Sequence, residues 1–358
     1  MCISASASNP EPVTRDSSAA RVCVIVVNQN RAALLSRCLD SLRSQTFSPS
    51  EILVVDNAST DDSRGVVTSQ GDPRIQLLPQ TVNRGFATAN NIAIRASTCP
   101  FIALLNNDAE ASESWLEHLV RAAGRDPGYG MWASRILLPD GKRIDKVGHL
   151  MFPDGQNRGR ATGQLNDGRF QKEEECFFPD GCAALYRKEL LAELGGFDED
   201  FFAYADDADL GVRANWLGWK CLYVPGAVVY HRHSSTLGPY SARKLYWVER
   251  NRLWLAVKNF PLPLLLANPL FTAYRWLWNL AAALAGKGAA GHLARETTLR
   301  VVVRTLIRSL ADGVRGIPAM WRKRRQVFRS RRISSLQFIR KLWIYRISAR
   351  DLAFQDHD

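Results

Sequence analysis

Three aspartates stand close together in the segment GGFDEDFFAYADDADLGVRANWLGW, residues 195–219. Asp206, Asp207 and Asp209 begin an expected helix directly after an aromatic loop. A helix N-terminus favours negative charge, and Asp209 can pair with Arg213 one turn later, so these effects explain one or two of the acids. An acid beyond that number, held near a substrate hydroxyl, could act as a general base. The aromatic loop itself could pack on the face of a sugar.

Two further carboxylates follow apolar runs that we expect to be buried strands. Asp56 ends the run 51–55, where it could accept a hydrogen bond from a nucleobase N–H or a ribose hydroxyl. Asp108 follows the run 101–105 within LLNND, and hard oxygen ligands there suit Mg²⁺ or Mn²⁺ bridging a diphosphate. The alternatives are an ordinary turn residue at position 56 and a loop acid without a metal at position 108.

The segment NRGFATANN, residues 83–91, is a glycine turn entering an expected helix. The free amides at the start of such a helix bind anions readily, and Arg84 is placed to meet a diphosphate. An ordinary junction between a loop and a helix is the alternative interpretation. A donor-binding set drawn from this turn and from the strand ends would comprise Asn30, Asp56, Asn57, Asn83, Arg84, Gly85 and Asn90.

Alternating elements must position these residues. From Arg21, apolar runs expected to be strands (22–27, 51–55, 74–78 and 101–105) alternate with helical segments (32–44, 61–69 and 86–96). This alternation predicts βαβ units and a parallel sheet, with ligands bound at the carboxyl ends of the strands. After a helix around 115–124, turn sequences indicate a β-rich insertion, and regular elements return at Phe177: a strand over 182–186, helices over 188–194 and 206–217, and a strand over 220–224.

Several classes of protein are disfavoured. No G-x-G-x-x-G follows the first strand, and the residues around Gly286-Lys287 do not form a P-loop, so neither a dinucleotide enzyme nor a P-loop NTPase fits. Seven scattered cysteines without a C-x-x-C pair favour a reducing, cytoplasmic setting. The polar segment 1–20 lacks the apolar core of a signal peptide, and we expect it to be a disordered leader.

The charge of the chain is concentrated near its C-terminus. Residues 287–350 hold 17 lysines and arginines against two acids, whereas residues 1–286 are neutral in sum. Arg300, Arg304 and Arg308 share one side of an expected helix whose other side is apolar, a pattern typical of membrane-surface helices. Residues 262–286 carry prolines, tryptophans and an arginine, which favour the membrane interface over a spanning helix. A solvated helix and nucleic-acid binding are the alternatives, but the neutral body offers no nucleic-acid module, so no nucleic-acid partner is expected.

Taken in order, the motifs VVDNASTDDS, NRGFATANN, LLNND and GGFDEDFFAYADDADLGVR resemble those of family 2 glycosyltransferases, particularly the bacterial branch that contains rhamnosyltransferases of polysaccharide assembly. The resemblance extends over about residues 22–235. It implies the GT-A fold, an α/β architecture with a Rossmann-like mixed sheet.

The resemblance also implies roles for individual residues. Asp207 would be the catalytic base and Asp206 its neighbour in the acidic motif. Asp56 would contact the nucleotide base, and the turn at Asn83–Gly85 the nucleotide sugar. Asp108 would be the surviving carboxylate of a D-x-D metal motif, because Asn106 stands in place of the first acid, and His231 would be a second contact to Mg²⁺ or Mn²⁺. The expected acceptor residues are Phe197, Asp198, Tyr204 and Asp209.

The expected organisation is a leader (1–20), a catalytic domain (21–239, with a nucleotide-sugar half at 21–110 and an acceptor half at 111–239) and a helical, basic, membrane-associating region (240–358). We expect an inverting glycosyltransferase that moves a sugar, with rhamnose as the candidate, from a nucleotide-diphosphate donor to a lipid-linked glycan at the inner face of the cell membrane. A catalytically silent glycan-binding protein is the first alternative. A chain shortened to about Lys258 is expected to leave the membrane and still bind donor.

Overall fold

The computed structural model describes residues 20–233 and 241–355 of the 358-residue chain. Apart from Ala20, the expected leader lies outside the described residues. The N-terminal part contains, in order, β1 (Val22–Asn28), α1 (Ala32–Arg43), β2 (Glu51–Asp56), α2 (Ser63–Thr68), β3 (Ile75–Pro79), α3 (Gly85–Ala96), β4 (Phe101–Leu105), β5 (Ala109–Ala111) and α4 (Trp115–Ala123).

The following part is richer in strands and then becomes helical. Its first elements are β6 (Tyr129–Leu137), β7 (Ile144–Lys146), β8 (His149–Met151), β9 (Asn157–Gly159), β10 (Glu174–Cys176), β11 (Ala183–Arg187), α5 (Lys188–Leu194), α6 (Asp206–Trp216) and β12 (Lys220–His231). The C-terminal helices are α7 (Ala242–Asn259), α8 (Leu262–Leu284), α9 (Gly288–Glu296), α10 (Leu299–Ser330), α11 (Ser335–Ile344) and α12 (Ala349–Phe354).

The main sheet is mixed, with the strand order β10-β12-β6-β11-β4-β1-β2-β3. The first four strands of the chain pair in parallel, as the alternating pattern predicts, and Asn28 lies in register with Asp56. β11 runs antiparallel to β4. The start of β11 therefore meets the end of β4, and residues just before β11 reach the same edge of the sheet as the ends of β1, β2 and β4.

The period of two along each strand divides the core between the faces of this sheet. In β1, Val22, Val24 and Val26 face the cluster that includes α1 and α4, whereas Cys23 and Ile25 face the cluster that includes α3, α5 and α6. The central strands β1, β2 and β4 thus bury both faces. This explains why they are continuous apolar runs instead of alternating ones.

One strand is longer than the sequence predicts. We expected a strand over 220–224 ending before Pro225, but β12 continues to His231, with a register shift between Val224 and Val228 against β6. The proline lies at this irregularity, where its missing N–H costs no ladder bond. The extension pairs His231 with Ala109 and so carries it to the end of β4.

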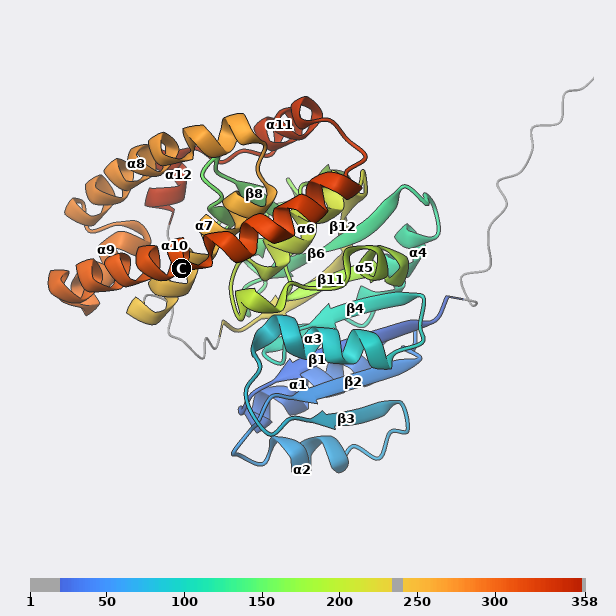
Figure 1. Ribbon diagram of the computed structural model, residues 1–358. Coiled ribbons are helices and arrows are strands. Elements are labelled where there is room, and N and C mark those ends of the chain that lie inside the picture. Colours follow the sequence, from blue (N-terminus) through green and yellow to red (C-terminus); the bar gives the residue numbers. More distant parts are fainter. Residues whose placement is uncertain (1–19, 234–240, 356–358) are drawn as a thin grey trace, which may run out of the picture.

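The C-terminal helices pack on the part of the chain that contains the sheet and share a core with it. Phe260, directly after α7, and Phe338 from α11 lie in one buried cluster with Phe177, Phe201 and Trp216. Figure 1 shows α8, α10 and α11 on the side of the molecule away from β1–β3. A chain ending near Lys258 would expose this cluster, so shortening the chain would change its folding as well as its membrane contact. That such a chain still binds donor stays a prediction. No helix within the described ranges is long and apolar enough to cross a membrane.

Candidate active site

The loops that follow β1, β2 and β4 join in a connected polar edge. Asn28 donates from Nδ2 to Ser59 Oγ at 3.1 Å and accepts at Oδ1 from Asn107 Nδ2 at 2.7 Å. Asn30 accepts at Oδ1 from the backbone N–H of Thr60 at 2.8 Å. The predicted donor residue Asn30 therefore lies at this edge and links the loop after β1 to the loop after β2.

Asp56 is buried at this edge with one oxygen unused. Its Oδ2 accepts from Arg64 Nε at 2.6 Å and from the Ser59 N–H at 3.3 Å. Its Oδ1 is buried and has no hydrogen-bond partner within the described part of the chain. Leaving a buried acceptor unsatisfied costs about 1–3 kcal/mol. The unused oxygen thus fits a ligand that brings an N–H or O–H donor.

The predicted turn at residues 83–85 is held by side-chain amides. Asn57 donates to Asn83 Oδ1 at 2.8 Å and accepts from the backbone N–H of Arg84 at 2.8 Å. Gly85 has φ of +78°, and a Cβ there would lie 2.4 Å from the carbonyl oxygen of Phe202. A glycine is therefore required, and the Arg84 side chain projects, exposed, from a fixed turn.

The remaining predicted binding residues differ in their positions. Asn90 is buried in α3, where Nδ2 donates to the Phe86 carbonyl at 2.9 Å, and Phe197 is buried with its ring edge-on to Phe86 and Tyr186. These positions favour structural roles over the predicted contacts with substrates. Tyr204 is partly exposed and remains a candidate for the acceptor side.

The predicted metal residues Asp108 and His231 lie side by side, and Asp145 lies at the other ring nitrogen of His231. His231 Nε2 is 3.2 Å from Asp108 Oδ1, and its Nδ1 is 2.9 Å from Asp145 Oδ2. His233 Nε2 approaches the same Asp145 oxygen at 3.0 Å. Ligand atoms of Asp145, His231 and His233 all lie within 4.8 Å of one another. Two imidazoles with carboxylates fit Mn²⁺ better than Mg²⁺, which prefers oxygen ligands.

Asp145 is ready to act as a ligand because it is ionised. Burial raises its pKa, but the charge of Lys146 and hydrogen bonds from His231 and His233 outweigh burial, so the pKa lies well below its ordinary value. Asp145 was not among the residues expected at the site, because it lies in the β-rich insertion and no sequence spacing relates it to β12.

Asp206 and Asp207 begin α6, as predicted. Asp206 Oδ1 accepts from the Asp207 N–H at 2.9 Å, whereas its buried Oδ2 has no partner within residues 20–233 and 241–355. Burial and the neighbouring charge of Asp207 raise the pKa of Asp206 to about 8. Burial also raises the pKa of Asp207, against the charge of His149. A carboxyl with a pKa of about 8 is protonated near neutral pH, so Asp206 holds a proton of this pair, and Asp207 is the candidate to accept another.

Asp207 also contacts groups that the sequence did not reveal. Its Oδ2 accepts from the Gly181 N–H at 3.2 Å. Asp180 accepts from Lys146 at 2.8 Å and lies 2.7 Å from His149 Nε2. The Gly181 backbone also borders the donor turn, because a Cβ there would lie 3.1 Å from the Phe86 ring and 3.6 Å from Asp207 Cβ. Asp207 and the donor turn therefore meet across one glycine.

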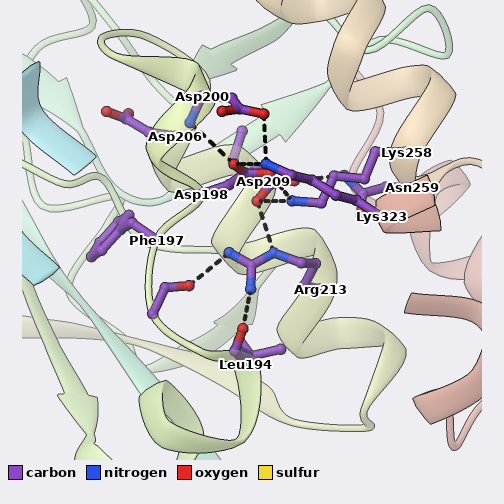
Figure 2. Close-up of polar contacts among 12 residues, drawn as sticks. Leu194, Phe197, Asp198, Asp200, Asp206, Asp209, Arg213, Lys258, Asn259 and Lys323 are labelled. Atoms are coloured by element: carbon purple, nitrogen blue, oxygen red, sulfur yellow. Dashed lines mark hydrogen bonds and ion pairs between the residues drawn. The ribbon is translucent and has the colours of Figure 1, made fainter. Parts of the chain in front are cut away.

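The two acids of the motif that were expected to bind the acceptor, Asp198 and Asp209, are enclosed by cations. Asp209 is fully buried, with Arg213 Nε at 2.7 Å and Lys258 Nζ at 2.8 Å from its Oδ2, and Lys258 is also 2.6 Å from Asp198. Figure 2 shows these ion pairs between α6 and α7, with Lys323 of α10 reaching Asp198 and Asp206 lying apart from them. The predicted acceptor contacts of Asp198 and Asp209 are disfavoured by this enclosure, because each carboxylate already balances a buried cation.

Two family models match the chain: "Glycosyl transferase family 2" at residues 23–195 and "Glycosyl transferase family group 2" at residues 162–311. A relative from Mycobacterium tuberculosis (strain ATCC 25618 / H37Rv), N-acetylglucosaminyl-diphospho-decaprenol L-rhamnosyltransferase, is 30% identical over 244 residues, covering 60% of this chain and 77% of the relative. The O-antigen biosynthesis protein RfbC of Myxococcus xanthus is 28% identical over 254 residues, covering 67% of this chain and 20% of that protein.

A solved structure, GalNAc-T7 with UDP, GalNAc and Mn²⁺, superposes with a TM-score of 0.55 at 14% sequence identity, covering 67% of this chain and 48% of the other. This likeness concerns the fold and confirms the GT-A architecture expected from the motifs. The family model over residues 23–195 and the M. tuberculosis relative show the family, and the solved structure shows the fold. The chain is a glycosyltransferase of family 2 with the GT-A fold and a helical C-terminal region.

Proposed function

We propose that this glycosyltransferase moves a sugar from a nucleotide-diphosphate donor to a hydroxyl of a lipid-linked glycan, with inversion at the anomeric carbon and Asp207 as the base. The observation that carries the proposal is the meeting of Asp207 and the donor turn at Gly181. This arrangement supports a role for Asp207 as proton acceptor beside the position that we propose for the donor sugar. The name of the M. tuberculosis relative supports rhamnose as the sugar and a polyprenyl-diphosphate-linked acceptor.

The transfer is a single displacement. The acceptor oxygen bonds to the anomeric carbon while the bond from that carbon to the diphosphate breaks, and the electron pair leaves with the diphosphate. Asp207 takes the proton of the acceptor hydroxyl. Because its pKa is about 8, Asp206 is protonated near neutral pH, and the negative charge of the pair then lies on Asp207.

The donor is held by residues at the ends of the parallel strands. The unused oxygen of Asp56 accepts from an N–H of the base, a donor that uracil and thymine carry at N3 and guanine carries at N1. Arg84, on its fixed turn, meets the diphosphate. Asp145, His231 and His233 would hold a divalent cation, Mn²⁺ in preference to Mg²⁺, and the ion when bound would offset charge on the leaving diphosphate. Asp108 lies at the other ring nitrogen of His231.

The acceptor side faces a membrane surface. In α8 the buried positions carry Arg275, which pairs with Asp154 at 2.7 Å, whereas the exposed face carries apolar residues at helical spacing. These exposed residues are Leu262, Leu266, Leu270, Tyr274, Leu277, Leu280 and Leu284. A helix with charge inside and leucine outside requires an apolar environment on its outer side.

The neighbouring α10 adds cations to this surface. Arg300, Arg304 and Arg308 are exposed along its first turns, as are Leu299, Val303 and Ile307. Exposed leucines beside exposed arginines match a leaflet with apolar chains and anionic headgroups. We therefore propose a peripheral association with the inner face of the cell membrane, where a lipid-linked acceptor is presented.

Saturation-transfer NMR with UDP-, dTDP- and GDP-sugars identifies the donor, and a coupled assay for nucleotide release then measures transfer to a lipid-linked acceptor. In that assay Asp207→Asn should bind donor normally and transfer about 10²–10⁴ times more slowly. Asp200→Asn, the same substitution at an exposed position of the same loop, is the control and should retain activity. Turnover of Asp207→Asn close to that of the control would remove Asp207 from the role of base.

A further inference from the structure

The loop that leads into the catalytic acids has an unfavourable backbone. Phe202, Tyr204 and Ala205 have φ of +52°, +66° and +61°. Residues with a side chain rarely adopt these values, because the Cβ crowds the backbone. Asp206 and Asp207 follow directly, so the position of the acids depends on a conformation that the loop does not favour by itself.

One side chain from α7 binds three carbonyls of this loop. Asn251 is fully buried, and its Nδ2 lies within hydrogen-bond distance of the carbonyl oxygens of Phe201, Ala203 and Tyr204, at 2.9, 2.8 and 2.8 Å. The amide has two hydrogens, so the three carbonyls share them. Asn251 therefore binds carbonyls that lie among the residues with positive φ, Phe202, Tyr204 and Ala205.

The intervening carbonyl binds the donor turn instead. The Phe202 carbonyl accepts from the Phe86 N–H at 2.8 Å, next to the glycine that its oxygen closely approaches. The Phe202 ring stacks on Trp247 of α7 at 5.1 Å between centroids. Four consecutive carbonyls, of residues 201–204, thus have partners outside the loop: Asn251 for three of them, and Phe86, directly after the donor turn, for the fourth. The Phe201 carbonyl accepts in addition from the Ala203 N–H at 2.5 Å.

The amide of Asn251 is itself held in one orientation. Arg250 donates from Nε to Asn251 Oδ1 at 2.8 Å and from Nη2 to the Asp200 carbonyl at 3.1 Å. Its guanidinium lies 4.2 and 3.9 Å from the ring centroids of Trp247 and Trp254. Since the oxygen of Asn251 is occupied by Arg250, the NH₂ group must face the loop.

We propose that Asn251 is a positioning residue for glycosyl transfer, which holds the strained loop at residues 202–205 so that Asp207 stays aligned with the donor turn. Asn251 lies on α7, outside the acidic motif, and it binds the expected acceptor residue Tyr204 through the backbone carbonyl alone. The inference rests on the proposed role of Asp207 as the base. Loss of the Asn251 side chain affects the alignment of the reacting groups more than the binding of donor.

The test compares Asn251→Ala with Asn215→Ala in the full-length chain. Asn215 is an equally buried asparagine whose Nδ2 donates to two carbonyls, of Phe177 and Gly211, both at 2.8 Å, along α6 beyond the acids. Both variants should lower the melting temperature. Only Asn251→Ala should lower kcat, by about 10²-fold, the effect of misplacing a catalytic group by about 1 Å, with the KM for donor little changed. If Asn251→Ala does not fold, Asn251→Ser, which keeps one donor, is measured in its place.

A second substitution separates positioning from general stabilisation. Glycine adopts φ near +61° without crowding, so Ala205→Gly added to the Asn251 variant should recover part of the lost kcat, while Ala205→Gly alone should have little effect. A kcat for Asn251→Ala equal to that of Asn215→Ala, or no recovery on adding Ala205→Gly, would overturn the inference. Asp207→Asn is measured in parallel: if it is slow while Asn251→Ala is unimpaired, only the inference about Asn251 fails, and if it is fast, the proposed base fails too.

Discussion

Replacing Asp206 by asparagine should stabilise the protein, and the gain should grow with pH. Asp206 is buried, and its pKa is raised from 3.8 to about 8, so the folded chain keeps this carboxyl protonated between about pH 5 and 7. In the unfolded chain the same carboxyl is ionised in this range. The folded state therefore binds one more proton than the unfolded state, and the stability that Asp206 confers falls as pH rises.

The magnitude follows from the size of this proton difference. One extra proton changes the free energy of unfolding by about 1.36 kcal/mol per pH unit, so about two units give about 2.7 kcal/mol. Asparagine does not titrate and can still accept the Asp207 N–H at its oxygen. The difference in stability between Asp206→Asn and wild type should therefore increase by about 2–3 kcal/mol from about pH 5 to 7.

Urea unfolding followed by tryptophan fluorescence at about pH 5, 6 and 7 measures this difference directly. Titration of groups other than Asp207, whose charge acts on Asp206, cancels between variant and wild type to first order. Asp200→Asn, at an exposed position, is the control and should differ from wild type by the same small amount at every pH. A stability difference for Asp206→Asn that does not change with pH would show that Asp206 is ionised in the folded protein, and the assignment of the shared proton would be refuted.

Three further predictions concern the donor, the metal and the membrane. Asp56→Ala should weaken nucleotide binding about 10- to 100-fold in calorimetry, the value of a hydrogen bond to a charged group, and unchanged affinity would remove Asp56 from the donor site. EDTA should abolish transfer, and Mn²⁺ should restore it. Metal binding should release a proton, because the ion displaces it from His231. Full activity in chelator would reassign Asp108 and His231 to hydrogen bonds with the diphosphate. Replacing Arg300, Arg304 and Arg308 by glutamine should weaken binding to phosphatidylglycerol vesicles, with a smaller loss at high salt, whereas Leu270→Ser should weaken it at every salt concentration. Wild-type protein that does not bind such vesicles would contradict the membrane proposal.

The sequence by itself determined the N-terminal half of the sheet and the edge where polar residues gather. Strands β1, β2 and β4 are local apolar runs separated by helices, and such units are parallel, so Asp56 and Asp108 had to lie at one edge. The helix that begins at Asp206 was equally predictable, because it depends on residues close in the chain.

Tertiary structure decided which acids remain available. Asp206, Asp207 and Asp209 share one local pattern, yet Asp209 is enclosed by Arg213 and Lys258, the latter about 50 residues further along the chain. Lys258 comes from α7, and no periodicity in the sequence relates that helix to α6. The sequence therefore identified an acidic cluster but could not separate the proposed base from the partner of a buried cation.

The same reason applies to His231, Asp145 and Asn251. An irregularity in β12 carries His231 to β5, an insertion brings Asp145 to it, and the packing of α7 brings Asn251 to the loop before the acids. Local patterns determine helices, strands and their ends, because these depend on neighbouring residues. Contacts between distant segments depend on how the elements pack, and only the folded chain determines them.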